Sequence, residues 1–183
     1  MGFVANAYGS AVAEILALDG NGQRRMPLAM GTCSSPEAAR HLRDSSPGSL
    51  LPGSSRAEAA YSGLWLYFSC LDESHQVSQG IRTEDGSFWH AIMHRQEPDA
   101  GNSAYWFRHA GRHPVFGVLR NEAKRLSVES PEVGFSVGEE WNPFDFIDFC
   151  EHARQRPGSA EEALALDIQR AEWQILFDYC ARP

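Results

Sequence analysis

Apolar residues recur at every third or fourth position over several stretches of this chain, which is the spacing of residues on one face of a helix. The clearest stretch predicts a continuous helix from Arg56 to Gln79 that ends at Gly80. Its start carries Ser55 and Glu58 at the spacing of a capping box, in which each side chain bonds the other's free backbone N–H. Apolar side chains occupy both sides of this helix, so we expect other helices to surround it.

Capping and helix-breaking residues predict the boundaries of the remaining helices. We expect these helices at 5–18, from Pro36 behind the cap Ser35, over 88–97 with Ser87 as its cap, from Asn102 or Ser103 to about His109, over 115–125, from Pro143 behind the cap Asn142, and from Ala160 behind the capping-box residue Ser159. Residues 130–140 are predicted to be irregular, with room for a short strand, and residues 45–55 to form a flexible loop rich in serine, proline and glycine. Because strong alternating patterns are absent, the sequence predicts an all-α fold, a single compact multi-helix domain over residues 1–183, with one or two short strands as the alternative.

The composition is that of a soluble globular protein, with 43% apolar and 22% charged residues. The formal net charge of −8 argues against a general nucleic-acid binder. The longest purely apolar run, Leu64–Phe68, is far too short to span a membrane, and no secretory signal peptide is visible. We therefore expect neither a nucleic-acid partner nor a membrane partner, and the oligomeric state stays open.

The chain has four cysteines, which are Cys33, Cys70, Cys150 and Cys180. None of them forms a CxxC pair, and the chain lacks the small size of a disulfide scaffold. The simplest interpretation is four reduced thiols, most of them buried. This interpretation implies a reducing compartment, and the predicted location is the cytoplasm.

Candidate chemistry is concentrated between residues 72 and 113, which include five of the seven histidines. Asp72 and His75 are three residues apart and therefore lie on one side of the predicted helix. Because that side is otherwise apolar, the two groups must be hydrogen-bonded, hydrated or metal-bound. A carboxylate three residues from a histidine also occurs in helical di-metal sites, whereas a hydrogen-bonded pair inside a core is the competing interpretation.

His90 and His94 are four residues apart on the next predicted helix, and Glu97 follows one turn later. Two histidines at this spacing can hold one zinc ion, and Glu97 is a candidate third ligand or general base. Position 91 is alanine, so the HExxH motif is absent and zinc-protease chemistry of that type is not indicated. The competing interpretation is a solvated polar face.

Arg108 and Arg112 share a face of the third predicted helix with Tyr105. Two arginines one turn apart can clamp a phosphate or a carboxylate through paired N–H bonds. The surrounding segment 88–125 contains six basic and three acidic residues, so it is locally positive within an acidic protein. The competing interpretation is a set of ion pairs with the acidic remainder of the chain.

At these residues the chain resembles a bacterial protein family that has no assigned function. The similar strings are Asp72–His75 (DESH), Trp89–Arg95 (WHAIMHR), Tyr105–Arg108 (YWFR) and Gly111–Pro114 (GRHP). The resemblance covers roughly residues 61–116 and the C-terminal helices, whereas the first fifty residues match poorly. The family pattern usually has arginine where this chain has Gln96 and His109, which makes His109 a weaker candidate ligand than the other histidines.

Consecutive helices usually pack as neighbours, so we expect these polar groups to line one shared pocket with aromatic walls. The favoured hypothesis is a pocket for a small anionic or sugar-like ligand. Its ligand-binding residues are predicted to be Arg95, Arg108, Arg112, Tyr105, Trp89 and Trp106.

The alternative hypothesis is a metal-dependent enzyme of hydrolase type. A divalent metal such as zinc is then held by His75, His90, His94 and Asp72, with Glu97 and His94 as the candidate catalytic groups. A third hypothesis is a protein-interaction module with a tryptophan-rich surface. The sequence does not decide whether the chain is an enzyme.

Overall fold

Ten α-helices form most of the protein in this computed structural model, which describes residues 2–183. Their bounds are α1 (Ser10–Ala17), α2 (Pro36–Arg43), α3 (Pro47–Leu50), α4 (Ala57–Tyr67), α5 (Leu71–Ser78), α6 (Glu84–Gln96), α7 (Ala100–Ala110), α8 (Phe116–Glu129), α9 (Pro143–Ala153) and α10 (Ala160–Ala181). No strand occurs among the described residues, so the all-α prediction is confirmed and its alternative with short strands is not found. Residues 130–140 are irregular, as predicted, apart from one 3₁₀ turn at Pro131–Val133. None of the described helices combines the length and the apolar character needed to cross a membrane.

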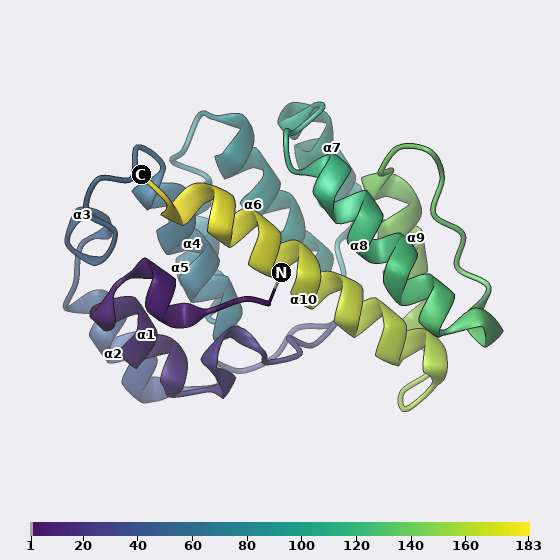
Figure 1. Ribbon diagram of the computed structural model, residues 1–183, viewed down its shortest axis with the longest axis horizontal. Coiled ribbons are helices and arrows are strands. Elements are labelled where there is room, and N and C mark those ends of the chain that lie inside the picture. Colours follow the sequence, from purple (N-terminus) through teal and green to yellow (C-terminus); the bar gives the residue numbers. More distant parts are fainter. Residues whose placement is uncertain (1) are drawn as a thin grey trace.

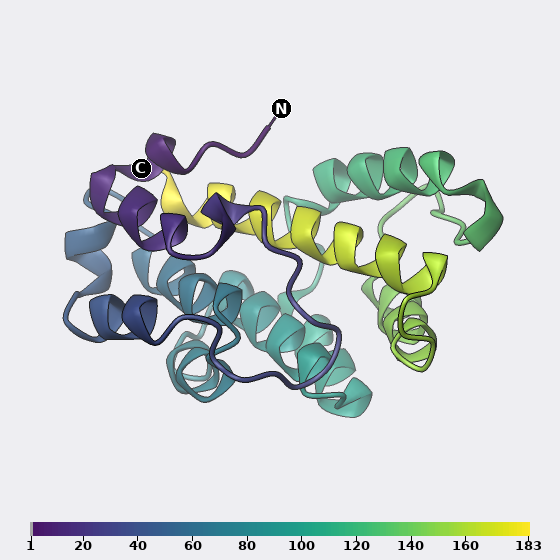
Figure 2. The same cartoon turned by 90° about the horizontal axis from the view of Figure 1, so that it is seen from below.

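The longest helix, α10, crosses the whole molecule (Figure 1). It packs against α4 towards one end of the molecule and against α8 and α9 towards the other. In the perpendicular view the N-terminal helices lie at one end and α8 and α9 at the opposite end (Figure 2). The C-terminal helix therefore connects two groups of helices that are far apart in the sequence.

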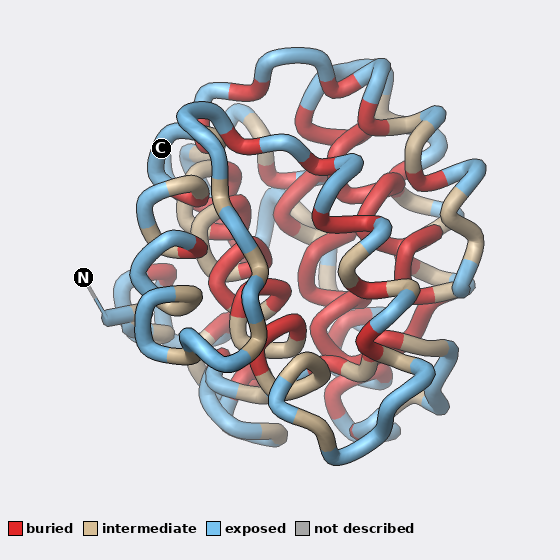
Figure 3. Tube along the Cα trace, turned by 90° about the vertical axis from the view of Figure 1, so that its right-hand side faces the viewer, coloured by how far each residue is buried: buried red, intermediate tan, exposed pale blue. Residues whose placement is uncertain are grey.

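Helix α6 lies at the centre of the fold, where every residue from Asp85 to Gln96 is buried. It packs against α4, α5 and α7. Buried stretches of the chain gather towards the middle of the molecule and exposed ones towards its outline (Figure 3). Gly63 lets the ring of Trp89 on α6 pack close to the backbone of α4, because a Cβ atom at position 63 would lie only 2.7 Å from that ring. Trp173 then joins α10 to the same point by donating its indole N–H to the carbonyl oxygen of Gly63 at 2.7 Å.

The prediction of one continuous helix over 56–79 was wrong, because this stretch forms two helices, α4 and α5. The break is at Ser69, whose φ of 57° is left-handed and cannot continue a helix. The guanidinium group of Arg24 bonds the carbonyl oxygen of Tyr67 and, at 3.0 Å, the hydroxyl of Ser69. A distant segment thus satisfies the backbone at the end of α4, which local periodicity does not reveal.

The start of α4 also differs from the prediction. Its N-cap is Arg56, whose side chain makes no capping bond, and Ser55 and Glu58 form no capping box. Most of α4 is nevertheless buried, which confirms that neighbouring helices surround this stretch.

Two further helices begin earlier than predicted because a different residue caps them. Thr83, not Ser87, caps α6 by accepting a bond from the N–H of Gly86 at 3.2 Å. Asp99 caps α7 by accepting from the N–H of Asn102 at 2.9 Å. Helix α7 ends at Ala110, one residue after the predicted end near His109, and the following Gly111 has a φ of 60°.

The predicted helix at 5–18 is interrupted by Gly9, whose φ is 96°, and consists of a 3₁₀ turn at Ala5–Tyr8 followed by α1. The segment 45–55, predicted to be a flexible loop, contains the one-turn helix α3 with a capping box at Ser46 and Ser49. Short polar side chains that bond nearby backbone favour such turns, so a serine-rich segment can be ordered locally.

Three predicted caps are confirmed by hydrogen bonds to the first turn of the helix. Ser35 caps α2, Asn142 caps α9 and Ser159 caps α10. At the last of these, the Glu162 carboxylate accepts a bond from the N–H of Gly158 at 2.6 Å rather than from Ser159. The acidic residue therefore satisfies a backbone donor one residue before the predicted one.

The prediction of four reduced cysteines was wrong, because Cys33 and Cys70 form a disulfide. The segment before α2 reaches the α4–α5 turn, where the N–H of Ser34 bonds the carbonyl oxygen of Phe68 at 2.7 Å. This contact brings together two cysteines that are 37 residues apart, a pairing that spacing alone does not reveal. Cys150 and Cys180 are free and buried, as expected. The cytoplasmic location, which was inferred from reduced thiols, remains a prediction without this support.

Candidate metal centre

Three histidines from two adjacent helices meet in the interior of the protein. His90 and His94 are one turn apart on α6, and α5 packs against α6 and brings His75 to the same place. One nitrogen of each ring can be chosen so that all three lie within 4.8 Å of one another. The prediction that the polar side chains of consecutive helices converge is therefore fulfilled by these three residues.

The three rings are packed closely and mostly out of contact with solvent. The ring of His90 is 4.7 Å from that of His75 and 4.8 Å from that of His94, measured between centroids. Only 1% of His90 and 8% of His94 is exposed, whereas His75 is half-buried. His75 therefore forms the side of the cluster nearest to solvent, and the competing interpretation of a solvated face for His90 and His94 does not hold.

Burial keeps the two histidines of α6 in their neutral form. Desolvation, together with smaller effects of the neighbouring His94 and His75, lowers the pKa of His90 to about 3. Desolvation also lowers the pKa of His94, although the Glu97 carboxylate opposes this effect. A neutral imidazole has a free lone pair, which is the form that binds a metal ion.

Glu97 fixes the orientation of the His94 ring. Its Oε2 atom lies 2.9 Å from Nδ1 of His94, one helical turn earlier. Because Nδ1 is engaged with a carboxylate, it carries the proton, and Nε2 is left as the nitrogen with a free lone pair. A histidine that is bonded to a carboxylate on one side and free on the other has the arrangement of a metal ligand.

Trp106 from α7 covers the other side of the cluster. Its ring stacks on that of His90 at 4.0 Å between centroids and with 16° between the planes. The Nδ1 atom of His90 is buried and has no hydrogen-bond partner among the described residues. A buried polar nitrogen without a partner costs about 1–3 kcal/mol, so an additional bonding partner at this atom would stabilise the protein.

The two carboxylates predicted for this site have different positions. Asp72 is exposed at the start of α5 and is not among the residues whose ligand atoms converge. Glu97 is also outside that group and contacts it only through His94. No hydrogen bond joins Asp72 to His75 among the described residues, and the exposed Asp72 fits the hydrated alternative.

Arg95, one of the predicted anion-binding residues, points into the core instead. Its guanidinium group forms an ion pair with Glu172 of α10, and the exposed fractions of the two side chains are 1% and 0%. Gln169, also on α10, accepts a longer bond from Arg95 at 3.4 Å. Glu172 lies between Ile168 and Ile175 on the apolar face of the last helix. A carboxylate in such a place needs a buried partner, so the sequence contained a signal for this ion pair.

The remaining predicted ligand-binding residues do not join the histidines, apart from Trp106. Trp89 is buried against Gly63, and Tyr105 is 48% exposed on α7. Arg108 and Arg112 line a separate cavity between α7 and α8. The predicted residues thus lie at two separate sites, and not in the single shared pocket that the sequence predicted.

No protein-family model matches the chain, and searches of curated proteins and of solved structures find no significant match. The function of the site is therefore argued from its geometry.

Proposed function

We propose that the protein binds one divalent transition-metal ion through His75, His90 and His94. The observation that carries this proposal is the convergence of three ring nitrogens within 4.8 Å. The lowered pKa values of His90 and His94 support it, because neither ring has to lose a proton before it can bind the ion. The carboxylate of Glu97 bonds Nδ1 of His94, and metal-bound histidines usually have such a partner on their other nitrogen.

Zinc is the ion that we expect first. Imidazole nitrogens suit zinc, copper, iron and nickel, and zinc accepts three histidines in tetrahedral geometry. A zinc–nitrogen bond of about 2.0–2.1 Å places tetrahedral ligand atoms roughly 3.3 Å apart. The nitrogens must therefore approach by at most about 1.5 Å, from 4.8 Å or less.

A centre with three protein ligands leaves a fourth position for water. Such open sites are typical of catalytic rather than structural zinc. The bound metal lowers the pKa of that water to ~7 and so supplies hydroxide at neutral pH. We therefore propose a metal-dependent hydrolase-type activity, with Glu97 as a positioning residue for His94 rather than as the general base.

Metal binding is tested on protein that carries no polyhistidine tag and has been stripped with a chelator. We expect one equivalent of Zn²⁺ or Co²⁺ by elemental analysis and calorimetry. The Co²⁺ form should show the intense visible absorption of a four-coordinate centre. His75→Gln, at the half-buried position, should weaken binding at least about 100-fold, because a ligand is lost.

The matched control is His109→Gln, which removes an exposed histidine from α7 and should bind metal as the parent does. Circular dichroism checks that both variants are folded. The absence of stoichiometric metal, or equal affinity of the parent and His75→Gln, would overturn the proposal.

Hydrolysis of p-nitrophenyl acetate and p-nitrophenyl phosphate by the zinc-loaded protein tests the activity separately. No zinc-dependent turnover of either ester would reject the hydrolase assignment and leave the metal site intact.

A further inference from the structure

A cavity of about 940 Å³, open to solvent, lies on the other side of α7 from the histidines. It is lined by the end of α7, the start of α8, and the segment from Glu139 to Phe144 that leads into α9. None of His75, His90 and His94 lines it. Its volume is that of a small-molecule site, for which 300–1,000 Å³ is usual.

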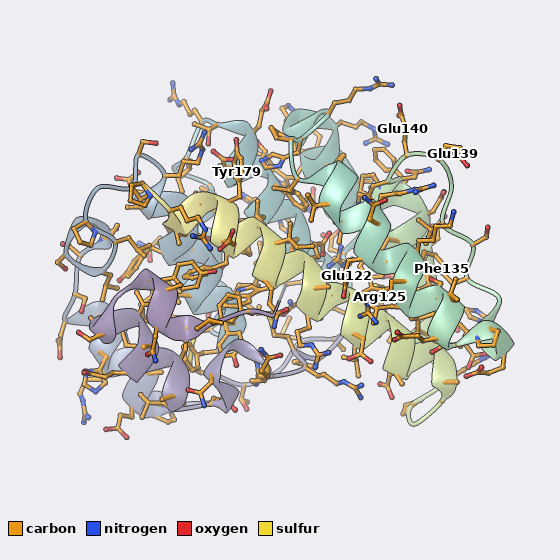
Figure 4. The ribbon with its side chains drawn as sticks, viewed as in Figure 1. Glu122, Arg125, Phe135, Glu139, Glu140 and Tyr179 are labelled. Carbon is orange, nitrogen blue, oxygen red and sulfur yellow. A yellow bond between two sulfur atoms is a disulfide. The ribbon has the colours of Figure 1, made fainter. Side chains whose placement is uncertain are left out.

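The walls of the cavity combine aromatic rings with basic groups. The rings are those of Phe107, Phe116, Trp141 and Phe144, and the basic groups belong to Arg108, Arg112 and Arg120. Glu139 and Glu140 are the acidic residues of the lining, and they lie at the outer edge of the molecule (Figure 4). Their side chains are 99% and 75% exposed, so their charges are well hydrated.

Arg108 carries a charge that no carboxylate of residues 2–183 neutralises through an ion pair. Its guanidinium carbon is 5.6 Å from the centre of the Phe144 ring, which keeps the group at the cavity wall. An unpaired guanidinium group beside aromatic rings is the usual arrangement for recognising the carboxylate or phosphate of an amphipathic ligand.

Arg112 and Arg120 differ in how firmly they are held. Arg112 pairs with Glu140 at 3.2 Å, but its side chain is 89% exposed, and such surface pairs contribute only about 0–1 kcal/mol. A bound anion can therefore compete for Arg112. Arg120 is only 17% exposed and donates to the carbonyl oxygen of Gly138 at 2.9 Å, which attaches the segment before Glu139 to α8. Arg120 thus shapes the cavity, and Arg108 and Arg112 remain for a ligand.

We propose that this cavity is a second binding site, which takes a small organic anion with a flat apolar body. The carboxylate or phosphate headgroup bonds Arg108 and Arg112, and the apolar body lies against Phe144 and the neighbouring rings. Glu139 and Glu140 at the edge disfavour ligands with several negative charges, so a single headgroup is expected. This site is independent of the metal centre, because it shares no residue with it.

The test uses chelator-treated protein, so that no probe can bind through a metal ion. Benzoate and phenyl phosphate are titrated separately by calorimetry or ligand-observed NMR, and the tighter of the two identifies the headgroup. We expect saturable binding of at least one of them with a Kd below about 1 mM, which corresponds to a binding free energy of ~4 kcal/mol in magnitude. Benzyl alcohol and inorganic phosphate, which lack the headgroup or the ring, should bind at least about tenfold more weakly.

Arg108→Gln should weaken the binding of the preferred probe at least about tenfold, because a charged hydrogen bond is lost. The matched control is Arg125→Gln, which removes an arginine of α8 that pairs with Glu122 away from the cavity (Figure 4). Phe144→Ala, at a partly exposed ring, should also weaken binding. The proposal is overturned by any of three results: no saturable binding of either probe, equal effects of Arg108→Gln and Arg125→Gln, or inorganic phosphate binding as tightly as phenyl phosphate.

Discussion

Oε2 of Glu97 lies 2.9 Å from Nδ1 of His94, and this contact determines which nitrogen of the histidine carries the proton. Glu97 is the last residue of the turn that ends α6, so the carboxylate is held close to a ring three residues earlier. The other ring nitrogen, Nε2, is thereby left with a free lone pair, and His94 is one of the three histidines whose ligand atoms converge.

Glu97→Ala should lower the affinity for Zn²⁺ by about 10- to 100-fold, which is the usual effect of losing the partner of a metal-bound histidine. Glu97→Gln should have a smaller effect, since its amide oxygen can still accept from Nδ1. Competition with a chromophoric chelator measures both affinities. The control is Asp72→Ala, which removes an exposed carboxylate near His75 and should leave the affinity unchanged. An equal loss in Asp72→Ala would show that Asp72 is a ligand after all.

The metal-free protein should lose stability as the pH falls from about 6.5 to 5. Burial lowers the pKa of His90 to about 3 in the folded protein, whereas the unfolded chain has the ordinary value of about 6.5. Below that value the unfolded state binds a proton that the folded state does not, so the free energy of unfolding decreases. His94, whose pKa is also lowered, acts in the same direction. Carboxylates with ordinary pKa values remain mostly ionised in this range, so comparison of the parent with a variant that lacks His90 isolates the contribution of that histidine.

Urea denaturation at a series of pH values in the presence of a chelator measures this dependence. For these two histidines we expect a loss of about 1–3 kcal/mol over the range, at up to ~1.4 kcal/mol per pH unit for each group. His90→Phe, which cannot titrate and can still stack on Trp106, should make the dependence shallower. A free energy of unfolding that is equally steep in parent and variant would contradict the lowered pKa of His90.

The sequence predicts the histidine cluster better than it predicts the arginine site, and helix geometry explains the difference. His90 and His94 are one turn apart on one helix, and His75 is on the preceding helix, so local spacing and neighbour packing suffice. On α7, Trp106 and Arg108 are two residues apart, which is 200° around a helix axis. Trp106 therefore contacts the histidines while Arg108 faces a different cavity.

Several of the failed predictions concern partners that are distant in the sequence. Arg95 follows His94 directly, but its orientation is decided by Glu172, which is 77 residues away. The break between α4 and α5 depends on Arg24 from an irregular segment, and the disulfide depends on the same approach of that segment to the turn. Periodicity and capping rules describe contacts within about one turn, so tertiary hydrogen bonds of this kind lie beyond them.

Gly63→Ala should destabilise the protein by about 1–3 kcal/mol, which is the usual cost of overpacking a core. The new methyl group would lie 2.7 Å from the Trp89 ring, and both residues are buried between α4 and α6. Gly117→Ala is the control, because a Cβ atom there meets nothing within 4 Å and alanine favours the helix. Thermal and urea unfolding compare the two variants. A Gly63→Ala protein as stable as Gly117→Ala would mean that α4 and α6 are less closely packed.

Glu172→Gln should destabilise the protein by about 3–5 kcal/mol, because it leaves the charge of Arg95 buried without a counter-charge. Burial raises the pKa of Glu172 even though Arg95 opposes the shift, which shows how strongly this position disfavours a charge. The guanidinium group also lies 4.5 Å from the centre of the Phe146 ring, so it has no route to solvent.

The double variant Arg95→Met with Glu172→Leu should recover most of that loss, since it removes both charges and keeps a similar volume. Urea unfolding of the two single variants and the double variant gives the coupling between the side chains. Arg125→Gln, which breaks an exposed pair with Glu122, should cost less than about 1 kcal/mol and serves as the reference. If the double variant is no more stable than Glu172→Gln, the buried pair contributes through its hydrogen bonds and packing rather than through the mutual neutralisation of two charges.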